Sequence, residues 1–408
     1  MSVSRDSVWQ ALSTVEDPDL KKPLTDLGMI DNLVVCDGHV SFALKLTTTA
    51  CPLKDFIKDS AINAVKALDG VVSVSAEISK DTITLQAKTP DRASVPGIRN
   101  VIAVSSGKGG VGKSTVSVNL ACSLAKQGAR VGILDADIYG PNVALMMGLQ
   151  GQKLKSATEQ NKIIPPQNHG VKVISMAFLV KDNQPVVWRG PMLDKVIRQF
   201  LVDTAWTYDD DGAGNFVPGG DLDYLIIDLP PGTGDAQLTI IQATPVVGAI
   251  IVTTPQDVAL LDSRKGLAMF QSGNIPILGI VENMSLYVCP SCGHEDAIFG
   301  VDGGRNAAAE LNVPFLGQVP ITPSIRLNAD AGTPIVMAEP DSKAAAVFKE
   351  LSHQVVAQVC AMGIEGVAVA EELSTGDEAP TCGIPAAAPH THDHGHDHAG
   401  HKEHAGCC

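Results

Sequence analysis

The stretch Gly107–Lys108–Gly109–Gly110–Val111–Gly112–Lys113–Ser114 decides the fold of this chain of 408 residues. Its spacing, G-x-x-x-x-G-K-[ST], is that of a phosphate-binding loop, or P-loop. The glycines let backbone N–H groups converge on phosphate oxygens, and the helix that follows adds its positive N-terminal end. We expect Lys113 to reach the β and γ phosphates and the Ser114 hydroxyl to ligate Mg²⁺. The predicted nucleotide contacts are Gly107, Lys108, Gly109, Gly110, Val111, Gly112, Lys113, Ser114 and Thr115.

The P-loop has the flanking elements that such a site requires. Residues 101–104 read as a buried strand before it, and residues 113–127 as a helix after it, ended by Gly128. Further continuous apolar runs recur along the chain, as expected for strands buried on both faces of a parallel sheet. These runs are 131–134, 171–174, 224–227, 249–252 and 277–281. We therefore predict an α/β domain with a doubly wound, mainly parallel sheet over 97–363.

An acidic residue and a glycine-rich loop follow one of these strands. Asp228 ends the apolar run at 225–227, the place of the carboxylate that supports the Mg²⁺ shell in P-loop enzymes. The next residues, 229–235, read LPPGTGD and are typical of a switch loop. Within it the Gly232 amide is positioned to sense the γ-phosphate.

Two further segments flank the predicted P-loop domain. Residues 1–90 show helical spacing at 7–15 and 54–68, strand alternation at 39–46 and two strands within 71–85, which predicts a small α+β domain. Residues 364–408 lose the apolar pattern and contain seven of the eleven histidines, so we predict a disordered, His-rich tail. Its histidines either capture metal ions or bind them only incidentally, and the sequence leaves both interpretations open.

Composition narrows the functional classes. The net charge of −15 disfavours nucleic acid as a partner. No apolar run is long enough to span a membrane, and the first residues form no targeting segment, so we expect a cytoplasmic protein with no membrane partner. In that compartment the nine cysteines are expected to be reduced thiols, ligands or buried small residues.

The strongest metal-binding pattern is Cys289–Pro290–Ser291–Cys292–Gly293. Two thiolates three residues apart can grip one metal centre, but a site within one chain usually needs a second such pair. No other C-x-x-C exists, although His294 is a possible third ligand. A symmetric dimer supplies four thiolates, which suits a bridging [4Fe–4S] cluster or a zinc ion. A thioredoxin-like redox role is a weaker interpretation.

The loop KGGVGKST resembles the deviant P-loop ATPases (MinD, ParA, nitrogenase iron protein and the Mrp/ApbC group). The resemblance implies a homodimer in which Lys108 reaches the γ-phosphate bound by the other subunit. It also implies that Asp137 orients or deprotonates the attacking water, with Asp135 as the alternative, and that Asn283 reads adenine. Since the guanine motif N-K-x-D is missing, we expect Mg²⁺ and ATP, with slow hydrolysis. Lys108, Lys113 and Asp137 are then the candidate catalytic residues.

The sequence from NMS at 283–285 to the cysteine pair, together with the P-loop and DLPPGTGD, is similar to the Mrp/ApbC iron–sulfur carrier family over about two-thirds of the chain. That resemblance implies a labile [4Fe–4S] cluster bridged by Cys289 and Cys292 of both subunits. It implies iron–sulfur apoproteins and scaffold proteins as partners. Residues 1–90 resemble the metal–sulfur assembly domain of such proteins, in which Cys51 either handles iron or a cluster or is a buried structural cysteine.

Two other functions fit parts of this pattern. One is a positioning ATPase like MinD or ParA, which needs a membrane-binding or DNA-binding surface that this acidic chain does not show. The other is a nickel or cobalt insertion NTPase, suggested by the His-rich tail. Nucleotide preference and the metal found after anaerobic reconstitution distinguish these functions.

Overall fold

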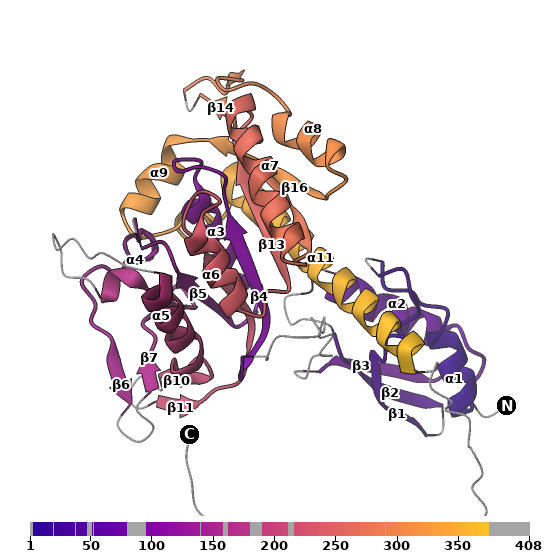
Figure 1. Cartoon of the computed structure of the whole chain (residues 1–408). Helices are drawn as coiled ribbons and strands as arrows, with labels where there is room; N and C mark the ends of the chain where they lie inside the picture. Colours follow the sequence, from indigo (N-terminus) through magenta and orange to yellow (C-terminus); the bar gives the residue numbers. More distant parts are fainter. Residues whose placement is uncertain are drawn as a thin grey trace, which may run out of the picture. The chain divides into compact units, whose positions relative to one another are not determined.

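A computed structural model describes residues 3–374, except 19, 37, 47–50, 52, 80–94, 139, 158–161, 180–189, 211–215 and 290 (Figure 1). It confirms the predicted fold class: a P-loop domain built on a mainly parallel sheet, and a small N-terminal domain with a mixed sheet. The tail was predicted to be disordered over 364–408, but residues 364–374 continue a helix, and residues 375–408 lie outside the described residues.

The N-terminal domain follows the predicted order of helices and strands. Its elements are α1 (Arg5–Leu12), β1 (Ile30–Cys36), β2 (His39–Leu44), α2 (Lys54–Lys66) and β3 (Ser73–Ile78). β2 pairs antiparallel with β1 and parallel with β3, and a hydrophobic core forms between this sheet and the helices. In α2, Ile57, Ala61 and Val65 are buried at four-residue spacing, which explains the helical pattern. The second strand predicted within 71–85 falls on residues that are not described.

The P-loop domain is organised around one sheet, in which the described residues form nine strands. Eight of them follow the order β15-β14-β13-β4-β12-β5-β9-β8, and β16 pairs with β14. All pairings are parallel except β14 with β15 and β8 with β9. The strands are β4 (Ile98–Ser105), β5 (Val131–Asp135), β8 (Gln167–Asn168), β9 (Val171–Ser175), β12 (Leu222–Asp228), β13 (Gly248–Thr253), β14 (Ile277–Val288), β15 (Glu295–Asp296) and β16 (Phe315–Ile321).

Helices cover both faces of this sheet. The helices are α3 (Lys113–Lys126), α4 (Val143–Met146), α5 (Gly190–Val202), α6 (Asp235–Ala243), α7 (Asp257–Ser272), α8 (Gly303–Glu310), α9 (Pro323–Asp330), α10 (Ile335–Ala338) and α11 (Lys343–Ser374), with a 3₁₀ turn at Met176–Phe178. Two small antiparallel pairs lie beside the sheet: β6 (Lys155–Ala157) with β7 (Lys162–Ile164), and β10 (Tyr208–Asp210) with β11 (Phe216–Pro218). Helix α11 continues to Ser374, so the expected domain end at 363 falls inside a helix.

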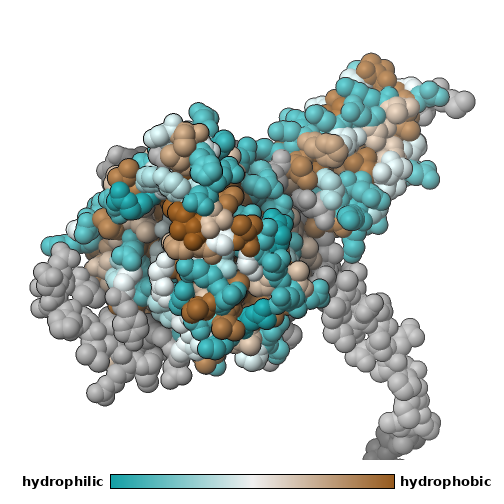
Figure 2. Space-filling view, turned by 90° about the horizontal axis from the view of Figure 1, so that it is seen from above, coloured by the Kyte–Doolittle hydropathy of each residue, from teal (hydrophilic) through white to brown (hydrophobic). Residues whose placement is uncertain are grey.

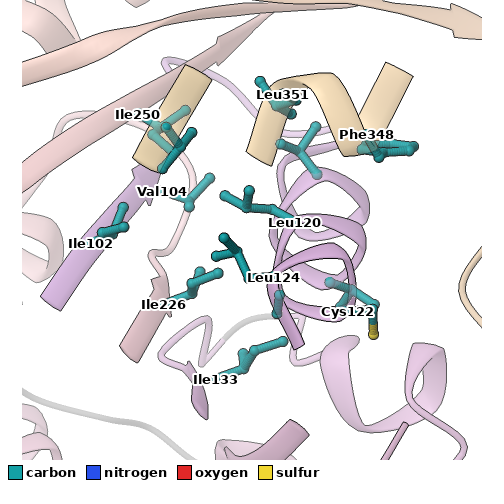
Figure 3. Close-up of a cluster of buried hydrophobic side chains, with 14 of the residues drawn as sticks. Ile102, Val104, Leu120, Cys122, Leu124, Ile133, Ile226, Ile250, Phe348 and Leu351 are labelled. Atoms are coloured by element: carbon teal, nitrogen blue, oxygen red, sulfur yellow. The ribbon is translucent and has the colours of Figure 1, made fainter. Parts of the chain in front are cut away.

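The continuous apolar strands are explained by two hydrophobic cores, one on each face. In β4, Ile102 and Val104 pack with α3 and α11, whereas Val101 and Ala103 pack with the helices of the opposite face, including α7. Figure 3 shows the first core, with side chains from the strands facing Leu120 and Leu124 of α3, and with Leu351 and Phe348 of α11 beside that helix. Successive side chains of a strand point to opposite faces of the sheet. Because both faces are covered by helices, the side chains on each face must be apolar.

Among the helices that the structure describes, none has the length and apolar content to cross a membrane.

Candidate functional site

The P-loop connects a strand, β4, to a helix, α3, as predicted, and β4 lies in the middle of the sheet. Gly110 and Gly112 adopt left-handed φ angles of 82° and 85°, a conformation that favours glycine. A Cβ at Gly107 would lie 2.3 Å from the backbone carbonyl carbon of Asp262 in α7, so no side chain fits there. The loop residues 109–115, with Asp137, Asn142 and Pro231, line a cavity of about 170 Å³. Sequence reasoning missed Asn142.

Lys113, Ser114 and Asp228 come together as expected for a nucleotide and Mg²⁺ site. The Lys113 ammonium lies 2.8 Å from Asp228 Oδ1, and the Ser114 hydroxyl donates to Asp228 Oδ2 at 2.6 Å. Ser117 also donates to Asp228 Oδ1, at 2.7 Å. Asp228 is fully buried, so these donors offset the cost of burying its charge. Ser117 was missed, although it follows Lys113 by one helical turn and therefore lies on the same face of α3.

Asp135 and Asp137 have different surroundings. Asp135 is fully buried and accepts hydrogen bonds from Ser175 Oγ at 2.8 Å and from the backbone N–H of Val143 at 3.2 Å. Burial, and next the negative charge of Asp228, raise the pKa of the Asp135 carboxyl. Asp137 instead lines the cavity beside the P-loop. Its position therefore suits contact with a bound nucleotide, whereas Asp135 is enclosed among its own hydrogen-bond partners.

The loop after β12 is held against the P-loop. The Gly232 amide, expected to sense the γ-phosphate, donates to the Ser106 carbonyl at 3.0 Å, and Gly232 has a left-handed φ of 99°. Gln237, which the sequence did not indicate, is buried and bridges the two segments. Its amide Nε2 donates to the Pro230 carbonyl, and its Oε1 accepts from Ser105 Oγ at 3.2 Å.

Asn283, the predicted adenine reader, lies on β14 and contacts the P-loop directly. Its side-chain Nδ2 donates to the Val111 carbonyl at 2.8 Å, and the residue is 6% exposed. A Cβ at Gly112 would lie only 2.1 Å from this Nδ2. Asn283 therefore fastens the P-loop to β14, a role that the sequence did not reveal.

Lys108 lies in the P-loop and is half-buried. Its ammonium forms no ion pair with the described residues of its own chain, unlike Lys113. Thr115 lies in the first turn of α3 and borders the same cavity.

Cys289 and Cys292 lie in a tight hairpin between β14 and β15. The backbone N–H of Cys289 donates to the His294 carbonyl, and that of Gly293 donates to the Cys289 carbonyl, each at 2.9 Å. Cys289 is half-buried and Cys292 is exposed. In the described parts of the chain, no three His, Cys, Asp or Glu side chains gather as a metal site. His294 therefore does not complete a three-ligand site, and the pair offers two thiols per protomer.

The Cys289 thiol has a lowered pKa. The backbone N–H of Ser291, then that of Cys292, and then the Cys292 side chain stabilise its thiolate. We expect the alkylation rate of Cys289 to rise at a lower pH than that of an ordinary thiol, whose pKa is about 8.5, because more thiolate is present at each pH. Peptide mass spectrometry of iodoacetamide-treated protein across pH measures this. The variant Cys292→Ala should shift the Cys289 profile to higher pH, and an unchanged profile would contradict the geometry.

Two other cysteines, Cys51 and Cys122, are buried, unlike this pair. Cys51 precedes α2, as predicted, but is 8% exposed and belongs to the core of the N-terminal domain. Burial raises the pKa of the Cys122 thiol to about 12, so it remains protonated and unreactive.

The chain is similar to known proteins in both of its domains. Residues 97–356 match the family described as ParA, NUBPL iron-transfer P-loop NTPase, and residues 5–77 match the family described as iron–sulfur cluster assembly protein. The iron–sulfur cluster carrier protein of Synechocystis is 48% identical over 360 residues, covering 88% of this chain and 98% of the relative. The carrier protein of Escherichia coli K12 is 39% identical over 355 residues, covering 87% and 92%.

One solved structure supports the fold of the P-loop domain. It is a nucleotide-binding protein from Archaeoglobus fulgidus in complex with ADP, 38% identical in sequence. The match has a TM-score of 0.51 and covers 61% of this chain and 91% of that one.

Proposed function

The chain belongs to the NUBPL-type family of iron-transfer P-loop NTPases, and we propose on that premise that it is an ATP-dependent carrier of iron–sulfur clusters. The observation that carries this proposal is the position of the cysteine hairpin. Cys289 follows directly on β14, the strand whose Asn283 also contacts the P-loop. One strand therefore connects a nucleotide site with a pair of exposed or half-exposed thiols.

We propose that Lys113 and Ser114 give up their contacts with Asp228 when the nucleotide binds. The Lys113 ammonium would move to the β and γ phosphates, and the Ser114 hydroxyl to Mg²⁺, which neutralises phosphate charge when bound. Asp228 would remain beside the ion as part of its shell. Its buried contacts with Lys113, Ser114 and Ser117 fit this role, because they hold the carboxylate in one orientation before nucleotide arrives.

For hydrolysis, we propose that Asp137 orients or deprotonates the attacking water. It lines the P-loop cavity, and its carboxylate accepts from the Gly140 amide at 3.1 Å, which fixes its direction. Gly232 would leave the Ser106 carbonyl to contact the γ-phosphate. Asn283 would accept from the adenine amine through Oδ1 while Nδ2 stays on Val111.

We propose that the working form is a homodimer bridging one [4Fe–4S] cluster. Each hairpin offers two thiols, and such a cluster takes four, so two protomers are needed. Lys108 would reach the nucleotide of the partner subunit. Exposed hydrophobic side chains border the site: Val258 and Leu261 at the start of α7, which abuts Gly107, and Ile298 and Val301 after the hairpin. Figure 2 shows hydrophobic groups among hydrophilic ones on the face seen from above. We propose that these exposed side chains take part in the contact between the two protomers.

The carrier function is tested by anaerobic reconstitution with iron and sulfide, followed by transfer to an iron–sulfur apoprotein with Mg²⁺ and ATP, GTP or no nucleotide. We expect the recipient to gain its cluster, and ATP to change the transfer rate more than GTP does. A chain that binds nickel or cobalt but no cluster would instead favour a metal-insertion NTPase. If the chain loads no metal but hydrolyses ATP, the result would favour a positioning ATPase like MinD or ParA.

A further inference from the structure

The contact between Asn283 and the P-loop has a consequence for the cysteine hairpin. The donor Nδ2 of Asn283 and the acceptor carbonyl of Val111 are 172 positions apart in sequence, yet their hydrogen bond is buried and 2.8 Å long. The absence of a side chain at Gly112 allows this close approach. A displacement of the P-loop backbone therefore acts directly on β14.

Between Asn283 and the hairpin, the pairing of β14 is irregular. Asn283 pairs with Val319 of β16, but the next pair joins Tyr287 to Ile321. Between these two pairs the chain advances by four residues along β14 but by only two along β16, which defines a bulge. Met284 within it has a left-handed φ of 57°, a strained conformation for a side chain of this size. Bulges interrupt regular pairing and redirect a strand next to functional sites.

On the other side of Asn283, the strand is anchored. Glu282 is fully buried, and its Oε2 accepts from the Gly304 amide at the start of α8 at 2.5 Å. Its Oε1 accepts from Gln318 Nε2 at 2.8 Å. Glu282 thus ties β14 to both α8 and β16. Motion imposed on Asn283 is therefore directed into the bulge and towards Cys289.

Nucleotide binding is expected to shift the P-loop backbone. Lys113 and Ser114, which follow Val111 closely, are bound to Asp228 in this structure. Under the proposed function, on which this inference rests, phosphate and Mg²⁺ compete for both groups. The loop that carries the Val111 carbonyl must then adjust at its helical end.

We propose that Asn283 is a positioning residue that couples nucleotide occupancy of the P-loop to the geometry of the cysteine hairpin, through the bulge at residues 284–286. Nucleotide binding shifts Val111, Asn283 follows, and the bulge turns this shift into a reorientation of the hairpin. By reciprocity, loading the hairpin changes nucleotide affinity by the same factor. The hairpin thereby responds to the P-loop within one protomer, independently of any change at a dimer interface.

Hydrogen exchange of peptides covering the hairpin tests this in the full-length, metal-free, reduced protein. The backbone amides of Cys289 and Gly293 are hydrogen-bonded within the hairpin, so their exchange reports its geometry. With saturating Mg²⁺ and ATPγS, we expect hairpin exchange in the native chain to change by about fivefold or more. In Asn283→Ala, at a concentration that saturates this variant, we expect most of the change to disappear. Asn168→Ala, which removes an equivalent 2.8 Å bond from an amide Nδ2 to the Met147 carbonyl, should respond like the native chain.

A second variant covers the case in which Asn283→Ala binds nucleotide too weakly to saturate. Ser285→Gly keeps Asn283 but loosens the bulge, because it removes the 3.2 Å bond from Ser285 Oγ to the Val319 carbonyl. It should bind nucleotide normally and show a reduced hairpin response. If Asn283→Ala is saturated with nucleotide and its hairpin exchange still changes as much as in the native chain, the proposal is overturned. If Asn283→Ala cannot be saturated, the same full response in Ser285→Gly overturns it. The proposal is also overturned if hairpin exchange in the native chain does not change when nucleotide is bound. A native chain that binds no nucleotide refutes the proposed function itself.

Discussion

Replacing Lys113 with alanine is expected to reduce ATP hydrolysis by at least about 100-fold, the usual cost of removing one donor that stabilises transition-state charge. Lys113 is the cation that the structure buries beside Asp228 at the P-loop, with only 6% of its side chain exposed. No other lysine of the same protomer is held at this position in the described chain. Steady-state phosphate release with Mg²⁺ and ATP measures the effect.

The matched control is Lys349→Ala, which removes an exposed lysine from α11 away from the P-loop. It should hydrolyse ATP at the native rate. Thermal unfolding of both variants separates a lost catalytic contact from a lost fold, since Ser114 and Ser117 still donate to Asp228 in Lys113→Ala. A folded Lys113→Ala variant with native hydrolysis would mean that the P-loop is not the catalytic site.

Replacing both Cys289 and Cys292 with alanine is expected to abolish cluster binding. After anaerobic reconstitution, the absorbance of the iron–sulfur chromophore and the bound iron should fall to the level of a protein without a site. These are the two thiols that the hairpin brings together, and the lowered pKa of Cys289 favours the thiolate that binds iron.

The double variant should remain folded and hydrolyse ATP, because Cys289 is only half-buried and Cys292 is exposed. Cys36→Ala, which removes another exposed thiol, is the control and should load normally. Full loading of the double variant would exclude the hairpin as the cluster site and direct attention to the N-terminal domain with Cys51.

The fold followed from the sequence because the strands of a doubly wound sheet are short, apolar and well separated. The predicted runs at 101–104, 131–134 and 224–227 all lie in central strands. The short strands β6, β7, β10 and β11 were not predicted, because three residues carry no measurable periodicity. The domain end placed at 363 fell within α11, because the helix continues through Gly363 and Gly366, although glycine is a poor helix former.

The site was predictable only where its residues form a local motif. The P-loop places Lys113 and Ser114 by spacing alone, and Asp228 follows from its position at a strand end. The contacts of Gln237 and Asn283 join segments far apart in the chain, and no local pattern encodes them. The same holds for Glu282, a buried carboxylate whose partners lie on α8 and β16.

Native mass spectrometry of the anaerobically reconstituted protein tests the central claim most directly, because it reports chain number and bound metal in one measurement. The account predicts that the cluster appears only on a species of two chains, with one [4Fe–4S] cluster per pair. A cluster retained by a single chain, or a metal ion held separately by each protomer, would contradict it.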